Sequence, residues 1–176
     1  MKNRNRRIAY IAVVAALYAA LTYAQNLLLP GSATMAVQFR VSEVLNVLAL
    51  FTPLAIPGLT IGCIISNLYS IGSGLPLDMI FGSIATLGAT SCMYFLRKVK
   101  IAKYPFLSML MPALWNGVII GWEIEYFFID GPFEWTGFLT QGGFVAIGEL
   151  AVMLTLGTVL YFIIDKRKIK KEIIQK

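Results

Sequence analysis

Long apolar stretches, separated by charged residues or by Pro/Gly turns, dominate the chain. Each approaches the roughly 20 residues that an α-helix needs to cross a bilayer. The pattern therefore predicts an all-α integral membrane protein, with six transmembrane helices that form a single transmembrane domain over residues 1–176. The predicted spans are 8–28, 38–52, 56–71, 78–96, 105–126 and 138–164.

The boundary between the second and third stretches is a short Pro/Gly segment. It reads Thr-Pro-Leu-Ala-Ile-Pro-Gly over residues 52–58. One long helix through this segment is disfavoured, because Pro53 and Pro57 remove backbone hydrogen bonds that lipid does not replace. We therefore predict a tight turn between two short helices.

The composition agrees with a membrane location. Of the 176 residues, 58% are hydrophobic and only 14% are charged, whereas about a quarter of a soluble domain is charged. A water-facing globule is thus a poor match. The net charge of +6 is divided among separate basic segments, which disfavours the continuous basic surface of a nucleic-acid binder.

The basic residues predict the orientation in the membrane. With six spans, the segments 2–7, 97–103 and 166–171 all fall on one face, and they hold most of the Lys and Arg residues. The connections on the other face contain neither residue type, and they cover 29–37, 72–77 and 127–137. Because short cytoplasmic loops carry the excess of positive charge, we predict that both termini are cytoplasmic and that the protein is multi-pass in the cell membrane.

Residue types that are missing narrow the chemistry. The chain contains no histidine, and its sequence offers no nucleophile–base pair, so we do not expect an enzyme. Cys63 and Cys92 lie in apolar stretches without metal-ligand spacing, so no metal site is predicted. The chain also has no Gly-Lys pair, and hence no Walker A loop to bind ATP.

A small set of polar residues inside the predicted spans is the candidate binding site. An ionisable group at mid-membrane costs about 3 kcal/mol by insertion scales, so each one calls for a partner or a cavity. The candidates are Arg40, Glu43, Asn46, Asn67, Asp78, Asn116, Glu123 and Glu149, with Trp122 as an aromatic neighbour.

Helical spacing groups some of these candidates. Arg40, Glu43 and Asn46 follow each other at intervals of three and share one helix face, although Arg40 and Glu43 can also simply neutralise each other. Asn116 and Glu123 lie two turns apart on one face.

Two acids allow competing interpretations. Glu149 lies about 16 Å into the last predicted span, too deep to reach water easily. We expect a functional role, against a structural pair with Arg40 or a protonated acid bonded to a neighbouring helix. Asp78 belongs either to the site or to the N-cap of the fourth helix.

The first span also carries stacked small residues. Ala12, Ala16 and Ala20 form one stripe, and Ala15 and Ala19 form a second. Such stripes let another helix approach closely, either from within the chain or from a partner.

The ordered set of motifs along the chain resembles the QueT family of queuosine-precursor transporters. The resemblance covers all the predicted spans, and its motifs are Val-Gln-Phe-Arg-Val-Ser-Glu over 37–43, Thr52-Pro53, Ile-Pro-Gly-Leu over 56–59, 78–87, Asn116-Gly117, Gly-Trp-Glu over 121–123 and Gly-Glu-Leu over 148–150.

The resemblance implies a substrate-binding S component of an energy-coupling factor (ECF) transporter, with an S-component-like helix bundle. Such a component captures a 7-deazaguanine, the aminomethyl or cyano precursor of queuosine, at the outer side of the membrane. Its implied partners are a transmembrane T component and two ABC-type ATPases, which use ATP, while this chain carries no cofactor of its own. The alanine stripes resemble the surface by which S components dock on the T component.

A deazaguanine suits the candidate residues. Its paired N–H donors match a carboxylate such as Glu149 or Glu123, and a second carboxylate can neutralise an ammonium group. An asparagine can supply a donor and an acceptor, while Trp122 or Tyr69 stacks on the ring. Two alternatives remain open: an S component for another vitamin-like molecule, and a self-sufficient secondary carrier.

Overall fold

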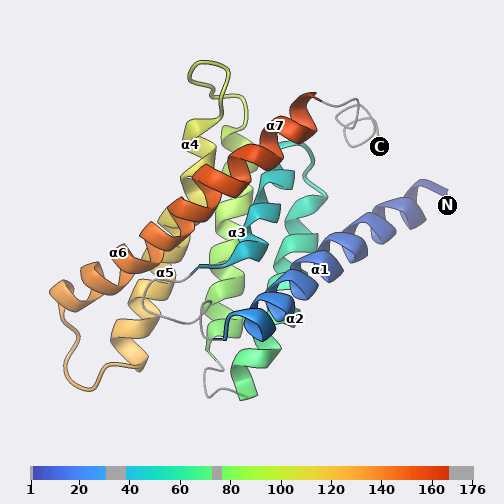
Figure 1. Ribbon diagram of the computed structural model, residues 1–176. Helices are drawn as coiled ribbons and strands as arrows, with labels where there is room; N and C mark the ends of the chain where they lie inside the picture. The colour runs from blue at the N-terminus through green and yellow to red at the C-terminus, as the bar shows by residue number, and fades with distance from the viewer. Residues whose placement is uncertain (1, 31–38, 73–76, 167–176) are drawn as a thin grey trace.

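The structure is a computed structural model that describes residues 2–30, 39–72 and 77–166 (Figure 1). The basic segment 167–171, most of the connections 29–37 and 72–77, and the side chain of Tyr69 lie outside the described part. Within that part the chain is helical throughout, apart from turns and one isolated bridge between Ile101 and Tyr104. The elements are α1 (Lys2–Leu28), η1 (Val41–Leu50), α2 (Ala55–Gly72), α3 (Asp78–Leu96), α4 (Phe106–Met109), α5 (Met111–Phe127), α6 (Trp135–Val152), η2 (Met153–Gly157) and α7 (Thr158–Lys166).

The long helices pack in sequence order around a short central one. α1 packs on α2, α2 on α3, α3 on α5, and α5 on α6, while η1 contacts α1, α2, α3, α6, η2 and α7. In Figure 1, α6, η2 and α7 form one continuous diagonal rod, and α1 diverges from the bundle toward the N-terminus. The short helix η1 is therefore the element around which the others assemble.

Two helix pairs meet almost backbone to backbone. A Cβ added at Gly62 of α2 would lie 2.7 Å from the Cβ of Tyr18 and 2.9 Å from the carbonyl oxygen of Ala15 on α1. A Cβ at Gly121 of α5 would lie 2.5 Å from the Cα of Gly142 on α6. Small residues at these crossings allow the close packing that holds helices together where lipid removes the hydrophobic driving force.

Four helical stretches are long and apolar enough to cross a membrane: Arg4–Leu28, Asp78–Leu96, Phe106–Phe127 and Trp135–Lys166. Two shorter apolar helices, Val41–Leu50 and Ala55–Leu68, accompany them. At about 2 Å of rise per residue, η1 spans about 20 Å of a hydrocarbon core that is about 30 Å thick. The chain is a bundle of apolar helices suited to a membrane, while the count of six spans and the cytoplasmic termini remain predictions.

The second predicted helix and the turn after it differ in detail from the structure. The stretch 38–52 forms a 3₁₀-helix over Val41–Leu50. The predicted turn 52–58 is shorter, because α2 already begins at Ala55 and includes Pro57 and Gly58 in its first turn. Proline fits there, since the first amide groups of a helix have no partner within the helix.

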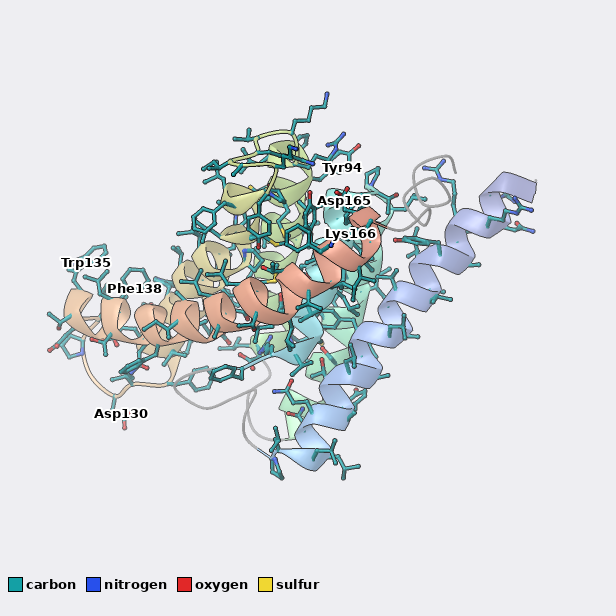
Figure 2. All side chains as sticks on the ribbon, turned by 45° about the horizontal axis from the view of Figure 1, so that its top comes forward. Tyr94, Asp130, Trp135, Phe138, Asp165 and Lys166 are labelled. Atoms are coloured by element: carbon teal, nitrogen blue, oxygen red, sulfur yellow. The ribbon has the colours of Figure 1, made fainter. Side chains whose placement is uncertain are left out.

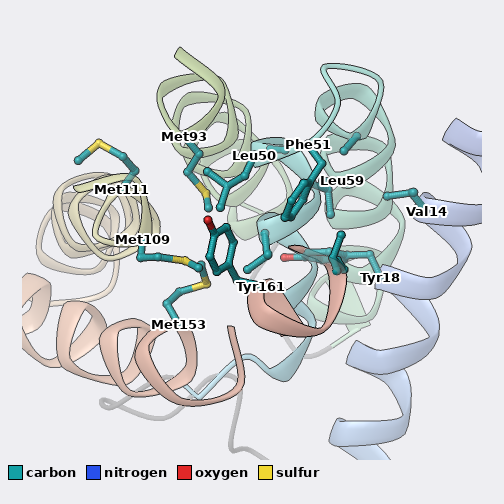
Figure 3. Close-up of a cluster of buried hydrophobic side chains, with 14 of the residues drawn as sticks. Val14, Tyr18, Leu50, Phe51, Leu59, Met93, Met109, Met111, Met153 and Tyr161 are labelled. Carbon is teal, nitrogen blue, oxygen red and sulfur yellow. The ribbon is translucent and has the colours of Figure 1, made fainter. Parts of the chain in front are cut away.

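Apolar side chains fill the half of the bundle where α3 ends and α5 begins. In Figure 3, Met93, Met109 and Met153 gather beside Tyr161. These four side chains are at most 3% exposed, and Phe51 stacks on Tyr161 with ring centroids 5.7 Å apart. We use the name apolar cluster for seven of these packed residues: Val47, Leu50, Phe51, Met93, Met109, Met153 and Tyr161.

Candidate functional site

The polar face of α1 fixes the start of η1. The side-chain amide of Gln25 accepts a hydrogen bond from the Val41 amide (2.7 Å) and donates one to the Phe39 carbonyl. One turn earlier, Thr22 donates to the hydroxyl of Ser42 (2.8 Å). These bonds hold the backbone on both sides of Arg40 against α1.

Glu43 lies at the centre of the bundle with both carboxylate oxygens engaged. Tyr18 of α1 donates its hydroxyl to one oxygen, and Asn46 donates its amide to the other. Glu43 and Asn46 have no exposed surface. Because η1 is a 3₁₀-helix, residues three apart lie directly above one another, which places Asn46 over Glu43.

Arg40 faces Asp78, the first residue of α3. Their side chains form a buried ion pair at 3.6 Å. Asn67 of α2 donates to the Asp78 carbonyl at 2.9 Å. A Cβ added at Gly82 would lie 2.9 Å from the Asn67 amide nitrogen and 3.6 Å from the Arg40 guanidinium, so glycine leaves room for this junction of η1, α2 and α3.

Glu123 and Glu149 carry buried carboxyl groups that accept no hydrogen bond from a donor group of the described residues. They are 0% and 1% exposed. Glu149 lies near Glu43 and Arg40, whereas the Glu123 carboxyl lies within hydrogen-bonding reach of the Asp78 carboxyl and near Arg40. Because buried polar groups are almost always paired, these two carboxylates call for a ligand.

We call Tyr18, Arg40, Glu43, Asn46, Asn67, Asp78, Glu123 and Glu149 the polar cluster. It gathers one guanidinium and four carboxyl groups, so acidic side chains outnumber basic ones. Two asparagine atoms are also buried without a partner among the described residues: Oδ1 of Asn46, an acceptor, and Nδ2 of Asn116, a donor on the same face of α5 as Glu123. The cluster therefore offers mainly acceptors and suits a ligand rich in N–H groups.

The structure separates the remaining candidates from this cluster. Trp122 is 38% exposed and stacks on Tyr126 with centroids 5.1 Å apart, beside Phe81. On α1, Ala12, Ala16 and Ala20 are exposed, whereas Ala15 and Ala19 are buried at 4% and 6%. The second alanine stripe thus serves packing within the chain, and the first one lies open.

Four structural alternatives raised by the sequence are not what the structure shows. The ion-pair partner of Arg40 is Asp78, rather than Glu43 or Glu149. The N-cap residue of α3 is Leu77, and Asp78 is the first residue of the helix itself. Glu149 forms no hydrogen bond to a neighbouring helix among the described residues.

Sequence reasoning missed the contribution of α1 to the site. Tyr18, Thr22 and Gln25 are buried at 1%, 6% and 6% exposure and bond to η1. Their spacing of four and three residues is that of one helix face. A polar stripe within an otherwise apolar span was the signal that could have identified them.

No metal site emerges beside the polar cluster. The described residues contain no group of three or more His, Cys, Asp or Glu side chains placed to hold a metal ion. The side chains that the cluster does contain can act by charge and by hydrogen bonds.

Comparisons with known proteins give one coherent result. Residues 8–166 match the model of the QueT transporter family. The chain is 35% identical over 171 residues to the queuosine precursor transporter QueT of Lactococcus lactis subsp. cremoris (strain MG1363), and the match covers 94% of each chain. No solved structure matches the chain.

Proposed function

We propose that this chain, which belongs to the QueT transporter family, is the substrate-binding S component of an ECF transporter and captures a 7-deazaguanine queuosine precursor. Family membership and the apolar helices make the chain a multi-pass membrane protein of a transporter family. The substrate, the S-component role and the partners are the proposed part.

The observation that carries the proposal is that the buried carboxyl groups of Glu123 and Glu149 accept no hydrogen bond from a donor group of the described residues. A deazaguanine carries two adjacent N–H donors on its Watson–Crick edge, and a carboxylate accepts such a pair in parallel. One of the two acids would bind this edge. The other would neutralise the ammonium of an aminomethyl substrate, because Arg40 already pairs with Asp78.

The remaining unpartnered atoms fit the same ligand. The amide of Asn116 can donate to the ring carbonyl of the base, and Oδ1 of Asn46 can accept a further N–H. A neutral, apolar ligand would leave all these groups desolvated and unpaired, at a cost of about 1–3 kcal/mol each.

Equilibrium binding to the purified, folded chain tests the substrate. We expect tight binding of the aminomethyl deazaguanine and weaker binding of the cyano form, which lacks the ammonium. Glu149→Gln should weaken binding roughly tenfold to hundredfold, because a hydrogen bond to a charged group is lost. The matched control is Glu134→Gln, which removes the same charge at an exposed site.

Each alternative predicts a different result. Binding of another vitamin-like molecule in place of deazaguanines would keep the S-component role and change the substrate. Uptake by the chain alone in liposomes, driven by an ion gradient without ATPases, would instead establish a secondary carrier.

Docking on a T component is proposed to use the open stripe Ala12, Ala16 and Ala20. Ala16→Leu should block co-purification with the T component and the two ATPases, because a large side chain separates the helices. Ala16→Ser keeps the surface small and should preserve the complex. Ligand binding by the isolated chain should be the same in both variants, so a change there would contradict a docking role.

A further inference from the structure

A large pocket opens at the end of the bundle opposite the connection 127–137. It has a volume of about 590 Å³. Figure 2 shows Tyr94 and Asp165 together at this end, far from Asp130 and Trp135. The pocket is lined by Arg7 of α1, residues 50–54, Tyr94, Arg97, Lys98, Lys100, Pro105, Tyr161 and Asp165.

The pocket is strongly cationic. Four basic side chains and a single carboxylate line it. The guanidinium of Arg97 lies 3.6 Å from the centre of the Tyr94 ring and donates to the Tyr94 carbonyl at 2.5 Å. Lys100 donates to the hydroxyl of Tyr161 at 3.2 Å. In these contacts aromatic rings and neutral oxygens hold the two cations, and the basic side chains of the lining outnumber its carboxylate, so the pocket as a whole favours an anion.

The loop that supplies most of these cations has a fixed shape. Ile101 and Tyr104 exchange two backbone hydrogen bonds of 2.9 Å each. Between them, Ala102 and Lys103 adopt positive φ angles of 49° and 69°, as in the tightest two-residue turns. The Tyr104 hydroxyl bonds to Thr158 of α7. The fold therefore fixes the backbone of the loop that carries Arg97, Lys98 and Lys100.

The other wall of the pocket is apolar. Leu50, Phe51, Leu54 and Pro105 belong to the lining, and Phe51 stacks on Tyr161 in the apolar cluster. A ligand that fills the pocket must therefore present an anion on one side and hydrocarbon on the other.

We propose that this pocket binds the phosphate headgroup of an anionic phospholipid. Arg97, Lys98 and Lys100 would hold the phosphate, and the apolar wall would contact the glycerol and the first acyl carbons. The pocket lies where the candidate spans that contain α3 and α7 end, so we infer that it lies at the level of the lipid headgroups, where basic pockets between helices bind such groups. A soluble phosphate would leave the apolar wall unused. The proposal is independent of the deazaguanine site.

Lipid titration of the purified full chain in zwitterionic detergent tests it. Native mass spectrometry would count bound phosphatidylglycerol and phosphatidylcholine, and a thermal-shift assay would compare these lipids with glycerol phosphate. The variant is Arg97→Gln/Lys100→Gln. Its matched control, Lys103→Gln/Lys166→Gln, removes two charges from the same end but outside the pocket lining.

We expect phosphatidylglycerol to bind in preference to phosphatidylcholine. The pocket double variant should weaken this binding about tenfold or more, and the control by less than about threefold. Equal losses in the two variants, or equal binding of the two lipids, would overturn the proposal. Glycerol phosphate binding as tightly as the lipid would assign the pocket to a soluble phosphate, and would equally overturn it. If the double variant does not fold, Lys98→Gln against Lys103→Gln decides by the same criteria.

Discussion

The polar cluster and the apolar cluster are built by the same elements at successive positions. η1 contributes Glu43 to the first and Leu50 to the second, and α3 contributes Asp78 and then Met93. In the apolar cluster, buried apolar side chains pack against other apolar side chains. In the polar cluster, Glu123 and Glu149 accept no hydrogen bond from a donor group in the part of the chain described. The difference indicates that one half of the bundle is packed for stability and the other is prepared for a ligand.

The largest effect should come from the cation of the polar cluster. Arg40→Met leaves Asp78 and the neighbouring acids buried without their positive partner, which costs about 3–5 kcal/mol. Denaturant unfolding in detergent measures this loss. Lys103→Met, at an exposed site, should change the free energy of unfolding by less than about 0.5 kcal/mol. If the two variants lose similar amounts of unfolding free energy, the buried charges of the polar cluster do not depend on Arg40, and the contrast between the two clusters fails.

The next effect belongs to the apolar cluster. Met153→Ala creates a cavity at a fully buried site and should cost about 2–5 kcal/mol. Its neighbour Leu154 is 38% exposed, so Leu154→Ala should cost clearly less. The comparison predicts that neither change alters ligand affinity in the folded protein. An affinity that falls along with the stability would show that the two regions are not separate.

A third change should have the opposite sign. Glu149→Gln replaces an unpartnered buried carboxylate with a neutral amide, which should stabilise the ligand-free protein by about 1–3 kcal/mol. Thermal unfolding with and without the deazaguanine should show a higher starting midpoint and a smaller shift on ligand addition. A lower midpoint in the ligand-free variant would instead mean that Glu149 supports the fold.

The smallest effect lies at the boundary between the clusters. Tyr18 belongs to the polar cluster because its hydroxyl donates to Glu43, while its ring packs among buried apolar side chains. Tyr18→Phe should therefore keep the packing and cost about 1 kcal/mol. Tyr23→Phe is the matched control, because Tyr23 also bonds from α1, to the Ile65 carbonyl, but at an exposed site. Chemical unfolding of both variants should show a smaller loss for Tyr23. The reverse order would place the stronger bond at the surface.

Much of this architecture was predictable, because apolar length and Pro/Gly interruptions act locally. The predicted span 78–96 coincides with α3, and the predicted first span ends with α1 at Leu28. The resemblance to the QueT family is confirmed by the family match and by the Lactococcus relative. The 3₁₀ form of η1 was not predictable from periodicity, because Arg40, Glu43 and Asn46 are spaced alike on one face of either helix type.

The partners within the site were harder to predict than its members. Spacing on one helix favoured Arg40 with Glu43, yet the ion pair joins Arg40 to Asp78 across two elements. Such pairings depend on how helices cross, which a single sequence does not encode locally. Whether these residues bind the ligand stays a prediction.

The element η2 (Met153–Gly157) is a π-helical turn within the last helix, and it sets how the two ends of that helix are oriented. Glu149 and Tyr161 are twelve residues apart, which in an unbroken α-helix would place them about 120° apart around the axis. A π-turn holds one more residue than an α-turn, a correction of about 100°. Glu149 and Tyr161 therefore lie on nearly the same side of the last helix. Glu149 faces the polar cluster from this side, and Tyr161 faces the apolar cluster. Deleting any single residue of Met153–Gly157 would rotate Glu149 relative to Tyr161 by about 100° around the helix axis, so that the two side chains could no longer both face their clusters.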